Sequence, residues 1–123
     1  MRLMSMLLCG VAILLVSLAY ASDGLIPYHI LERSETGTIK VALDVEVPLV
    51  SGRLPTEEEL GALSRHLVSL ERDHDRSFVL FYLPGMKVGS GAYATAHHNP
   101  ELEVKVLDFM LAQYPEYQSL LTD

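Results

Sequence analysis

Residues 39–47 read Ile-Lys-Val-Ala-Leu-Asp-Val-Glu-Val, and this stretch decides the fold. Apolar side chains stand at every second position, and Lys40, Asp44 and Glu46 lie between them. Alternate side chains of a β-strand point to opposite faces of its sheet. The stretch therefore predicts a strand with one buried face and one mostly solvated face, which Pro48 ends.

The sequence after this strand has the pattern of a helix from Thr56 to about Arg72. Thr56 can cap the first turn, and Glu59, three residues later, can complete a capping box. The acidic side chains of this turn also suit the positive end of the helix dipole. Leucines recur at helical spacing and form one apolar stripe, made of Leu60, Leu63, Leu67 and Leu70. We expect this stripe to cover one face of the sheet.

The rest of the chain contains short strand patterns separated by turn residues. Leu25–Arg33 predicts a first strand, followed by a turn over residues 34–37. The continuous apolar and aromatic run Ser77–Leu83 is typical of a strand buried on both faces. Gly91–His97 and Leu102–Val106 predict a fourth and a fifth strand.

Leu107–Tyr114 suits a short helix that Pro115 breaks, and the apolar residues of 117–121 suggest a last docked turn. The predicted order is β-β-α-β-β-β-α, and connections this short favour a largely antiparallel sheet. The expected fold is α+β. It is a two-layer sandwich in which about five strands are covered by one helix and followed by a short C-terminal helix.

The first 21 residues have the three-part layout of a secretory signal peptide. Met1-Arg2 is a basic start, and Met6–Leu18 is an apolar run shorter than the ~20 residues of a membrane-spanning helix. Ala19-Tyr20-Ala21 then places small residues at the cleavage position. We expect removal of residues 1–21 and a single domain over residues 22–123.

The one cysteine of the chain, Cys9, lies within this leader, so the mature chain would carry no disulfide, thiolate or cysteine-bound metal. Exported domains without disulfides are common in bacteria, which favours the periplasm or the bacterial exterior. The net charge of −7 becomes −8 when Arg2 leaves with the leader. Such a charge repels nucleic acid and anionic membranes, so neither is expected as a partner.

Residues 81–107 contain four short motifs: Tyr-Leu-Pro-Gly-Met at 82–86, Gly-Ala-Tyr-Ala-Thr at 91–95, His-His-Asn-Pro at 97–100 and Leu-Glu-Val-Lys at 102–105. This stretch resembles a group of uncharacterised exported bacterial proteins. Tyr93 stands where that group usually has Trp, and His98 where another aromatic residue is usual. The resemblance implies a shared fold and no known activity.

The loop Gly85–Gly91 is similar to a phosphate-binding loop only in its glycines and Lys87. Phosphate-binding glycines open a helix, whereas these lead into a strand pattern. We interpret the loop as an adaptable connection with two exposed apolar residues, Met86 and Val88.

The histidines do not form a metal-binding pattern, and no cofactor is predicted. His97 and His98 are adjacent, so in a strand they point to opposite faces. None of the five histidines shows the helical i, i+4 pairing of zinc enzymes, because the others lie on separate predicted elements: His29, His66 and His74.

The fourth predicted strand carries the main candidate surface. Its alternation places Ala92, Ala94 and Ala96 on one face and Tyr93, Thr95 and His97 on the other. Neighbouring strands would add charged side chains to the second face: Lys40, Asp44, Glu46, Glu103 and Lys105. A half-open face with aromatic and polar groups suits a peptide or glycan, although an ordinary solvated face has the same pattern. We predict these binding residues: Met86, Lys87, Tyr93, Thr95, His97 and Asn99.

Two functional classes follow from the sequence. The first is a small, exported, non-catalytic binding or inhibitory module whose partner is an envelope protein, a peptide or a glycan. The alternative is a small envelope hydrolase that uses His97. A triad could be assembled from Ser90 or Thr95 with His97 and Asp44, but the sequence has no nucleophile-elbow pattern.

Overall fold

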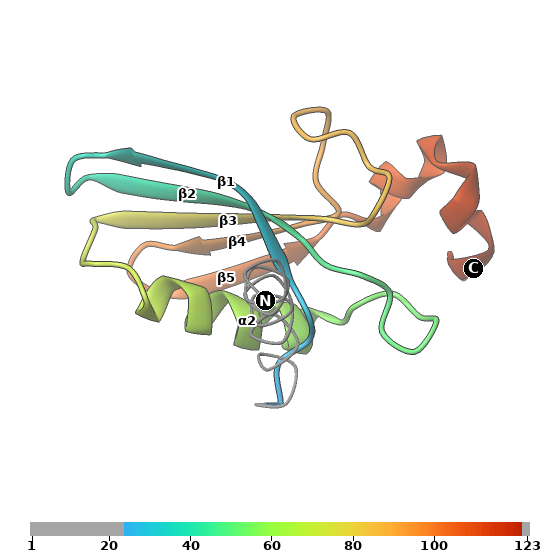
Figure 1. Ribbon diagram of the computed structural model, residues 1–123, viewed down its shortest axis with the longest axis horizontal. Coiled ribbons are helices and arrows are strands. Elements are labelled where there is room, and N and C mark those ends of the chain that lie inside the picture. Colours follow the sequence, from blue (N-terminus) through green and yellow to red (C-terminus); the bar gives the residue numbers. More distant parts are fainter. Residues whose placement is uncertain (1–23, 122–123) are drawn as a thin grey trace, which may run out of the picture.

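The computed structural model describes residues 24–121, which form one five-stranded sheet with a helix on one face and two 3₁₀ helices at the C-terminal end (Figure 1). The predicted leader lies outside the described residues. In chain order the elements are β1 (His29–Thr36), β2 (Lys40–Glu46), α2 (Glu57–Ser69), β3 (Arg76–Tyr82), β4 (Ala94–His98), β5 (Leu102–Val106), η2 (Asp108–Gln113) and η3 (Pro115–Leu120). The predicted α+β class is confirmed.

The strands follow the chain order across the sheet, β1-β2-β3-β4-β5. Only the pair β2–β3 is parallel, and the other three pairs are antiparallel. The parallel pair has a simple cause: α2 lies between its strands in the sequence, and parallel neighbours need a long crossover. The sheet is therefore mostly antiparallel, as the short connections predict.

The core lies between the sheet and α2. Val41, Leu43 and Val45 of β2 are buried on the helix side, which confirms the alternation of residues 39–47, but Ile39 lies in the hairpin turn and is half exposed. The helix contributes the buried Leu60, Leu63 and Leu67, and the adjoining strands contribute Val79, Phe81, Ala94 and Ala96. Leu70 lies at the helix C-cap and is exposed, so it does not belong to the apolar stripe.

The predicted capping box is present. Thr56 Oγ1 accepts a hydrogen bond from the Glu59 N–H at 3.2 Å, and the Glu59 carboxylate accepts one from the Thr56 N–H at 2.9 Å. Arg53 donates two further hydrogen bonds to Glu59, at 2.9 and 2.8 Å. The start of the helix is thus tied to the segment that precedes it.

Several predicted boundaries are wrong. The first strand runs over residues 29–36 and not 25–33, because Thr36 still pairs with Lys40 and the turn contracts to residues 37–39. The helix ends at Ser69 and not near Arg72. The fourth strand begins at Ala94, and the C-terminal segments are 3₁₀ helices where an α-helix was expected.

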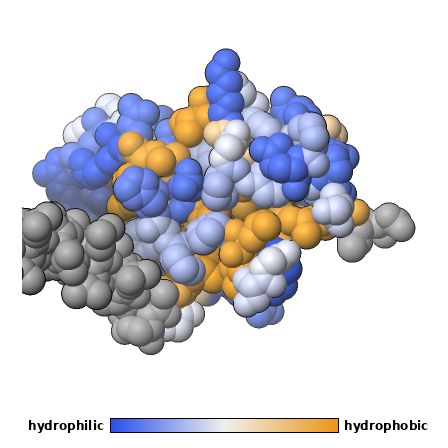
Figure 2. Space-filling model, turned by 45° about the vertical axis from the view of Figure 1, so that its right-hand side comes forward, coloured by the Kyte–Doolittle hydropathy of each residue, from blue (hydrophilic) through white to orange (hydrophobic). Residues whose placement is uncertain are grey.

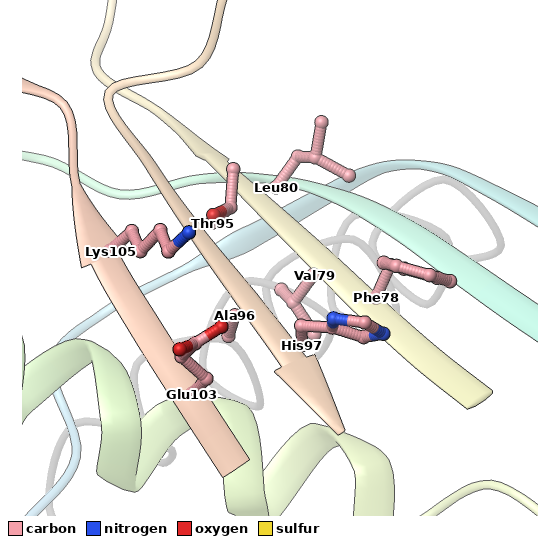
Figure 3. Close-up of a pocket in the computed structure, with 8 residues that line it drawn as sticks. All are labelled: Phe78, Val79, Leu80, Thr95, Ala96, His97, Glu103 and Lys105. Atoms are coloured by element: carbon pink, nitrogen blue, oxygen red, sulfur yellow. The ribbon is translucent and has the colours of Figure 1, made fainter. Parts of the chain in front are cut away.

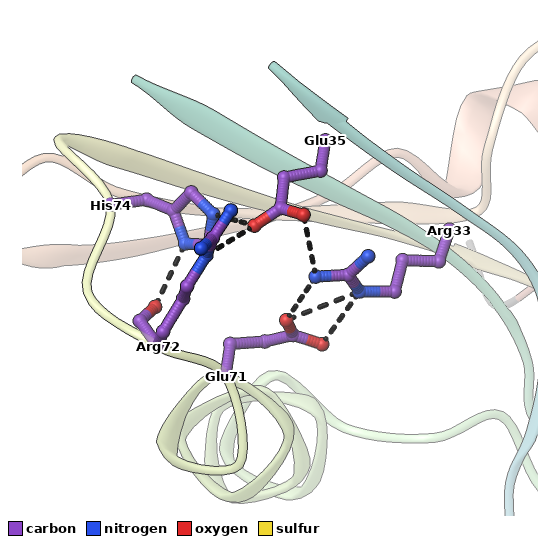
Figure 4. A network of polar contacts seen from close by, with 5 residues as sticks. All are labelled: Arg33, Glu35, Glu71, Arg72 and His74. Atoms are coloured by element: carbon purple, nitrogen blue, oxygen red, sulfur yellow. Dashed lines mark hydrogen bonds and ion pairs between the residues drawn. The ribbon is translucent and has the colours of Figure 1, made fainter. Parts of the chain in front are cut away.

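A charged network ties β1 to the end of α2 and the loop after it (Figure 4). Arg33 Nη2 lies 2.7 Å from Glu71 Oε1 and 3.4 Å from Glu35 Oε1. Glu35 Oε2 accepts hydrogen bonds from Arg72 Nε at 2.8 Å and from His74 Nε2 at 2.6 Å. Arg33 and Glu35 are opposite Leu43 and Val41 of β2, so their side chains lie on the helix side of the sheet. The helix itself contacts β4 and β5, and the network covers β1, which the helix does not reach.

The network makes stability depend on pH. The pKa of Glu35 falls from 4.5 to about 2 because Arg72 and His74 donate hydrogen bonds to its carboxylate. A carboxyl whose pKa is lowered by folding stabilises the native state above its unfolded pKa, and that contribution disappears as the pH falls through 4.5 towards 2. We expect the urea midpoint to be level above about pH 5 and to drop below it.

The variant Glu35→Gln should have a lower urea midpoint at pH 7 and a smaller further drop in acid. Its matched control is Glu101→Gln, an exposed carboxylate in the β4–β5 turn, outside the network. An acid profile of Glu35→Gln that parallels the wild type would show that this carboxylate does not carry the pH dependence.

Candidate functional site

The sheet face opposite α2, called the open face below, has no helix of residues 24–121 over it (Figure 1). The strand register places two rows of side chains across it. One row is Ser34, Ala42, Phe78, His97 and Glu103, and the next is Glu32, Asp44, Leu80, Thr95 and Lys105. Charged residues of β2 and β5 therefore share a face with Thr95 and His97, as the alternation predicts.

The surface carries hydrophobic residues outside this face as well. Figure 2 shows a hydrophobic band crossing a mostly hydrophilic surface. The large apolar side chains that are more than a third exposed come from five different segments: Ile30, Leu31, Ile39, Leu70, Val88 and Phe109. Because these exposed apolar side chains are spread over five segments, they do not mark a single binding site.

A hollow of about 240 Å³ lies on the open face (Figure 3). Its lining comes from three adjacent strands: Phe78, Val79, Leu80, Thr95, Ala96, His97, Glu103 and Lys105. In Figure 3 the Lys105 amine points towards Thr95, and the His97 ring lies beside the Phe78 ring. A second, more polar hollow of about 390 Å³ shares His97 and Glu103 and extends to Asn99 and Glu101. The two hollows together follow the β4–β5 hairpin.

The rings of Phe78 and His97 line the first hollow together. Their centroids lie 4.3 Å apart, and their planes differ by 15°, which is a stacked arrangement. The Lys40 ammonium lies 5.4 Å from the Phe78 centroid, within the range of a cation–π contact. The His97 Nε2 atom is buried and has no hydrogen-bond partner. A buried polar atom without a hydrogen-bond partner is uncommon in folded proteins.

The open face also contains two carboxylates that repel each other. Asp44 and Glu32 are directly opposite on β2 and β1. The pKa of Asp44 is raised, first by burial and then by the charge of Glu32. None of the ion pairs in residues 24–121 joins either carboxylate to a basic side chain, so the β1–β2 side of the face stays acidic.

The predicted position of Tyr93 on the polar face is wrong. Its side chain is 2% exposed, and its hydroxyl donates a hydrogen bond to the Pro55 carbonyl at 2.8 Å. Because β4 begins only at Ala94, the strand alternation does not extend to Tyr93, and Ala92 beside it is buried as well. Burial also raises the pKa of the Tyr93 hydroxyl to about 12. Tyr93 is a core residue.

The predicted exposure of Met86 is also wrong. It is 7% exposed, and its Sδ accepts a hydrogen bond from the Leu83 N–H at 3.3 Å. Val88 is exposed as expected. Lys87 lies on the same loop, and its N–H donates to the Tyr114 hydroxyl at 3.0 Å.

The C-terminal 3₁₀ helices hold this loop in place, contrary to the predicted adaptability. The Tyr117 hydroxyl donates a hydrogen bond to the Pro84 carbonyl, and a methyl group at Gly91 would lie 1.9 Å from Met110 Cε. No residue of the loop lines either of the two hollows.

Of the other candidate residues, some line a hollow and some do not. Thr95 and His97 line the first hollow, and Asn99 lines the second. Asp44 and His97 are separated by β3, so their backbones are about two strand spacings, roughly 10 Å, apart. The supposed triad is therefore not brought together. His98 points away and pairs with Ser64 Oγ at 2.8 Å, and burial lowers its pKa.

The sequence prediction missed Phe78 and Leu80. The run Ser77–Leu83 was expected to be buried on both faces, but Phe78 and Leu80 are only half buried. Their positions within the strand could have identified them. They alternate with the buried Val79 and Phe81 next to a strand already predicted to have a polar face.

Comparisons with protein-family models, curated proteins and solved structures find no match to this chain. The similarity of residues 81–107 to exported bacterial proteins therefore stays a prediction. No helix within residues 24–121 is long and apolar enough to cross a bilayer, and no three potential metal ligands of that segment gather around one point.

The core position of Tyr93 gives a testable difference between two variants. Tyr93→Phe leaves the Pro55 carbonyl without its donor and should lower the free energy of unfolding by about 1 kcal/mol. Tyr93→Ala also removes the buried ring and should cost about 3–5 kcal/mol. Urea unfolding followed by circular dichroism measures both values. Wild-type stability in Tyr93→Ala would contradict the core assignment.

Proposed function

We propose that the protein is a small, exported, non-catalytic binding module that holds its ligand in the hollow of the open face. The observation that carries the proposal is the Phe78–His97 stack beside a buried imidazole nitrogen without a partner. A half-buried aromatic ring and an unsatisfied polar atom are both costly for a free protein. A ligand in the hollow would cover the ring, and a small turn of the imidazole would bring its nitrogen within reach of a ligand donor or acceptor.

The lining indicates the chemistry of the ligand. The half-buried Phe78 and Leu80 give the hollow an apolar side, which suits an apolar side chain or the apolar side of a sugar. The Thr95 hydroxyl, the Glu103 carboxylate and the Lys105 ammonium supply a polar border. Ligand sites for drug-sized molecules usually measure about 300–1,000 Å³, so a hollow of about 240 Å³ suits one sugar ring or one or two side chains. The ligand is then a local part of a larger peptide, glycan or envelope protein.

The proposed location rests on the sequence. The leader over residues 1–21 is typical of export, and the mature chain would meet its partner in a bacterial envelope or outside the cell. The acidic net charge favours neither nucleic acid nor an anionic membrane as that partner.

The alternative of a hydrolase that uses His97 has less support. A general-base histidine is usually oriented by a carboxylate or carbonyl on its other ring nitrogen. Within the described residues the His97 side chain contacts the Phe78 ring, and no carboxylate forms a hydrogen bond with it. Non-catalytic binding needs no such partner, and for this reason we prefer it.

The binding proposal is tested with three purified proteins: the wild type, Phe78→Ala and Phe109→Ala. Each is used to capture partners from an envelope extract, and the captured partner is then titrated in pure form by calorimetry. Phe78→Ala removes the aromatic ring that lines the hollow. This change should weaken the affinity about thirtyfold, as expected for an interfacial anchor worth ~2 kcal/mol. Phe109 is 67% exposed on η2, away from the hollow, so its variant is the matched aromatic control.

Equal affinities for all three proteins would place the ligand elsewhere and overturn the proposal. The hydrolase alternative is tested on peptidoglycan and ester substrates with the wild type and His97→Ala. Turnover that is lost in His97→Ala would overturn the non-catalytic assignment, whereas a stoichiometric complex without turnover supports it.

A further inference from the structure

The strand β5 ends the sheet, and its outer backbone groups are free. The Leu107 N–H donates to the Tyr93 carbonyl at 2.6 Å, and the Glu101 carbonyl accepts from the Asn99 N–H at 3.2 Å. Both ends of β5 therefore turn odd-numbered residues towards β4. Because the hydrogen-bonding direction alternates along an antiparallel strand, the N–H and C=O groups of Leu102, Val104 and Val106 point to the outer edge. Within residues 24–121 these groups have no partner beyond the sheet.

The sequence of β5 is complementary to itself in the antiparallel direction. Residues 102–106, Leu-Glu-Val-Lys-Val, alternate apolar and charged side chains. Reversing their order keeps this alternation and exchanges the acidic and basic positions. When two copies pair about Val104, Glu103 of each lies opposite Lys105 of the other, and Leu102 lies opposite Val106. The outward groups of Val104 then form a hydrogen-bonded pair with those of the second Val104, as the alternation requires.

We propose that β5 is a self-association edge, at which a second copy of this chain adds its own β5 in antiparallel orientation. The occupant follows from the charges, because opposite charges facing each other across strands are favourable and like charges are not. A two-fold axis through Val104 satisfies both copies in the same way, which is the usual symmetry of homodimers. This inference is independent of the binding function proposed above.

The surroundings of β5 agree with this arrangement. A lone lysine on an edge strand usually prevents pairing, but Lys105 is balanced by Glu103 two residues away. Neither side chain takes part in an ion pair within the described chain. On the inner face, α2 comes close enough that a methyl group at Gly61 would lie 3.6 Å from Val104 Cγ2. The helix thus covers the apolar side of β5.

The edge is only five residues long, so the dimer should be weak and depend on protein concentration. Pairing would join the two sheets into one and bring the two open faces together at the axis. Glu103 and Lys105 both line the first hollow, so the hollows of the two copies would meet at the shared strand pair.

The experiment is sedimentation equilibrium of the mature chain over a wide concentration range, with a charge-exchange series. Glu103→Lys sets Lys opposite Lys105 twice in the dimer, and Lys105→Glu sets Glu opposite Glu103 twice. Each single variant should weaken dimerisation about tenfold or more, and higher salt should weaken the wild-type dimer. The double variant E103K/K105E restores opposite charges and should dimerise like the wild type.

Glu116→Lys is the matched control, since it makes the same change of charge at an exposed residue of η3, outside β5, and should dimerise like the wild type. Circular dichroism checks that every variant folds. Amide exchange adds a direct readout, because protection at Leu102, Val104 and Val106 should rise with protein concentration. A wild type that stays monomeric at every concentration overturns the proposal. It is also overturned by single variants that dimerise normally, or by a double variant that does not regain dimerisation.

Discussion

A single helix cannot cover a five-stranded sheet, and the rest of the structure depends on this limit. The strands from β1 to β5 span about 19 Å, whereas a helix with its side chains is about 10 Å wide. The helix α2 lies against β4 and β5, where the small residues Ala94 and Ala96 lie beneath the leucine stripe. On the same side, β1 is covered by the ion pairs of Arg33 and Glu35. No helix of the described residues lies over the opposite face, so its side chains remain available for other contacts.

This asymmetry gives Phe78 and Leu80 their unusual environment. A central strand carries apolar residues on both faces because both are usually covered. Here one face lacks that cover, and Phe78 is shielded instead by the ring of His97 and the ammonium of Lys40. The stack reduces the exposed apolar area, but it leaves a ring nitrogen without a hydrogen bond. The candidate site therefore arises from the arrangement of the layers, and no short sequence motif marks it.

The features that the sequence predicted well are those set by neighbouring residues. The two-residue period of 39–47 and the Thr56–Glu59 capping box need only local geometry, and both are present. Tyr93 and Met86 were placed wrongly because distant groups decide their positions. The carbonyl of Pro55 accepts from Tyr93, and the C-terminal 3₁₀ helices fix the loop that carries Met86. A local sequence pattern cannot tell whether an aromatic or apolar side chain is exposed or buried when its contacts come from a distant segment.

The strand β5 connects the two proposals through Glu103 and Lys105. Both side chains border the hollow, and both would face a second copy at the sheet edge. A ligand group that neutralises Lys105 competes with the carboxylate of the partner copy, whereas a ligand that contacts only Phe78 and His97 leaves the edge pairs intact. Ligand binding and self-association would then be linked, and the linkage is reciprocal, since each changes the affinity of the other by the same factor. Coupling is therefore expected only for a ligand that engages Lys105, and its absence would place the ligand at Phe78 and His97 alone.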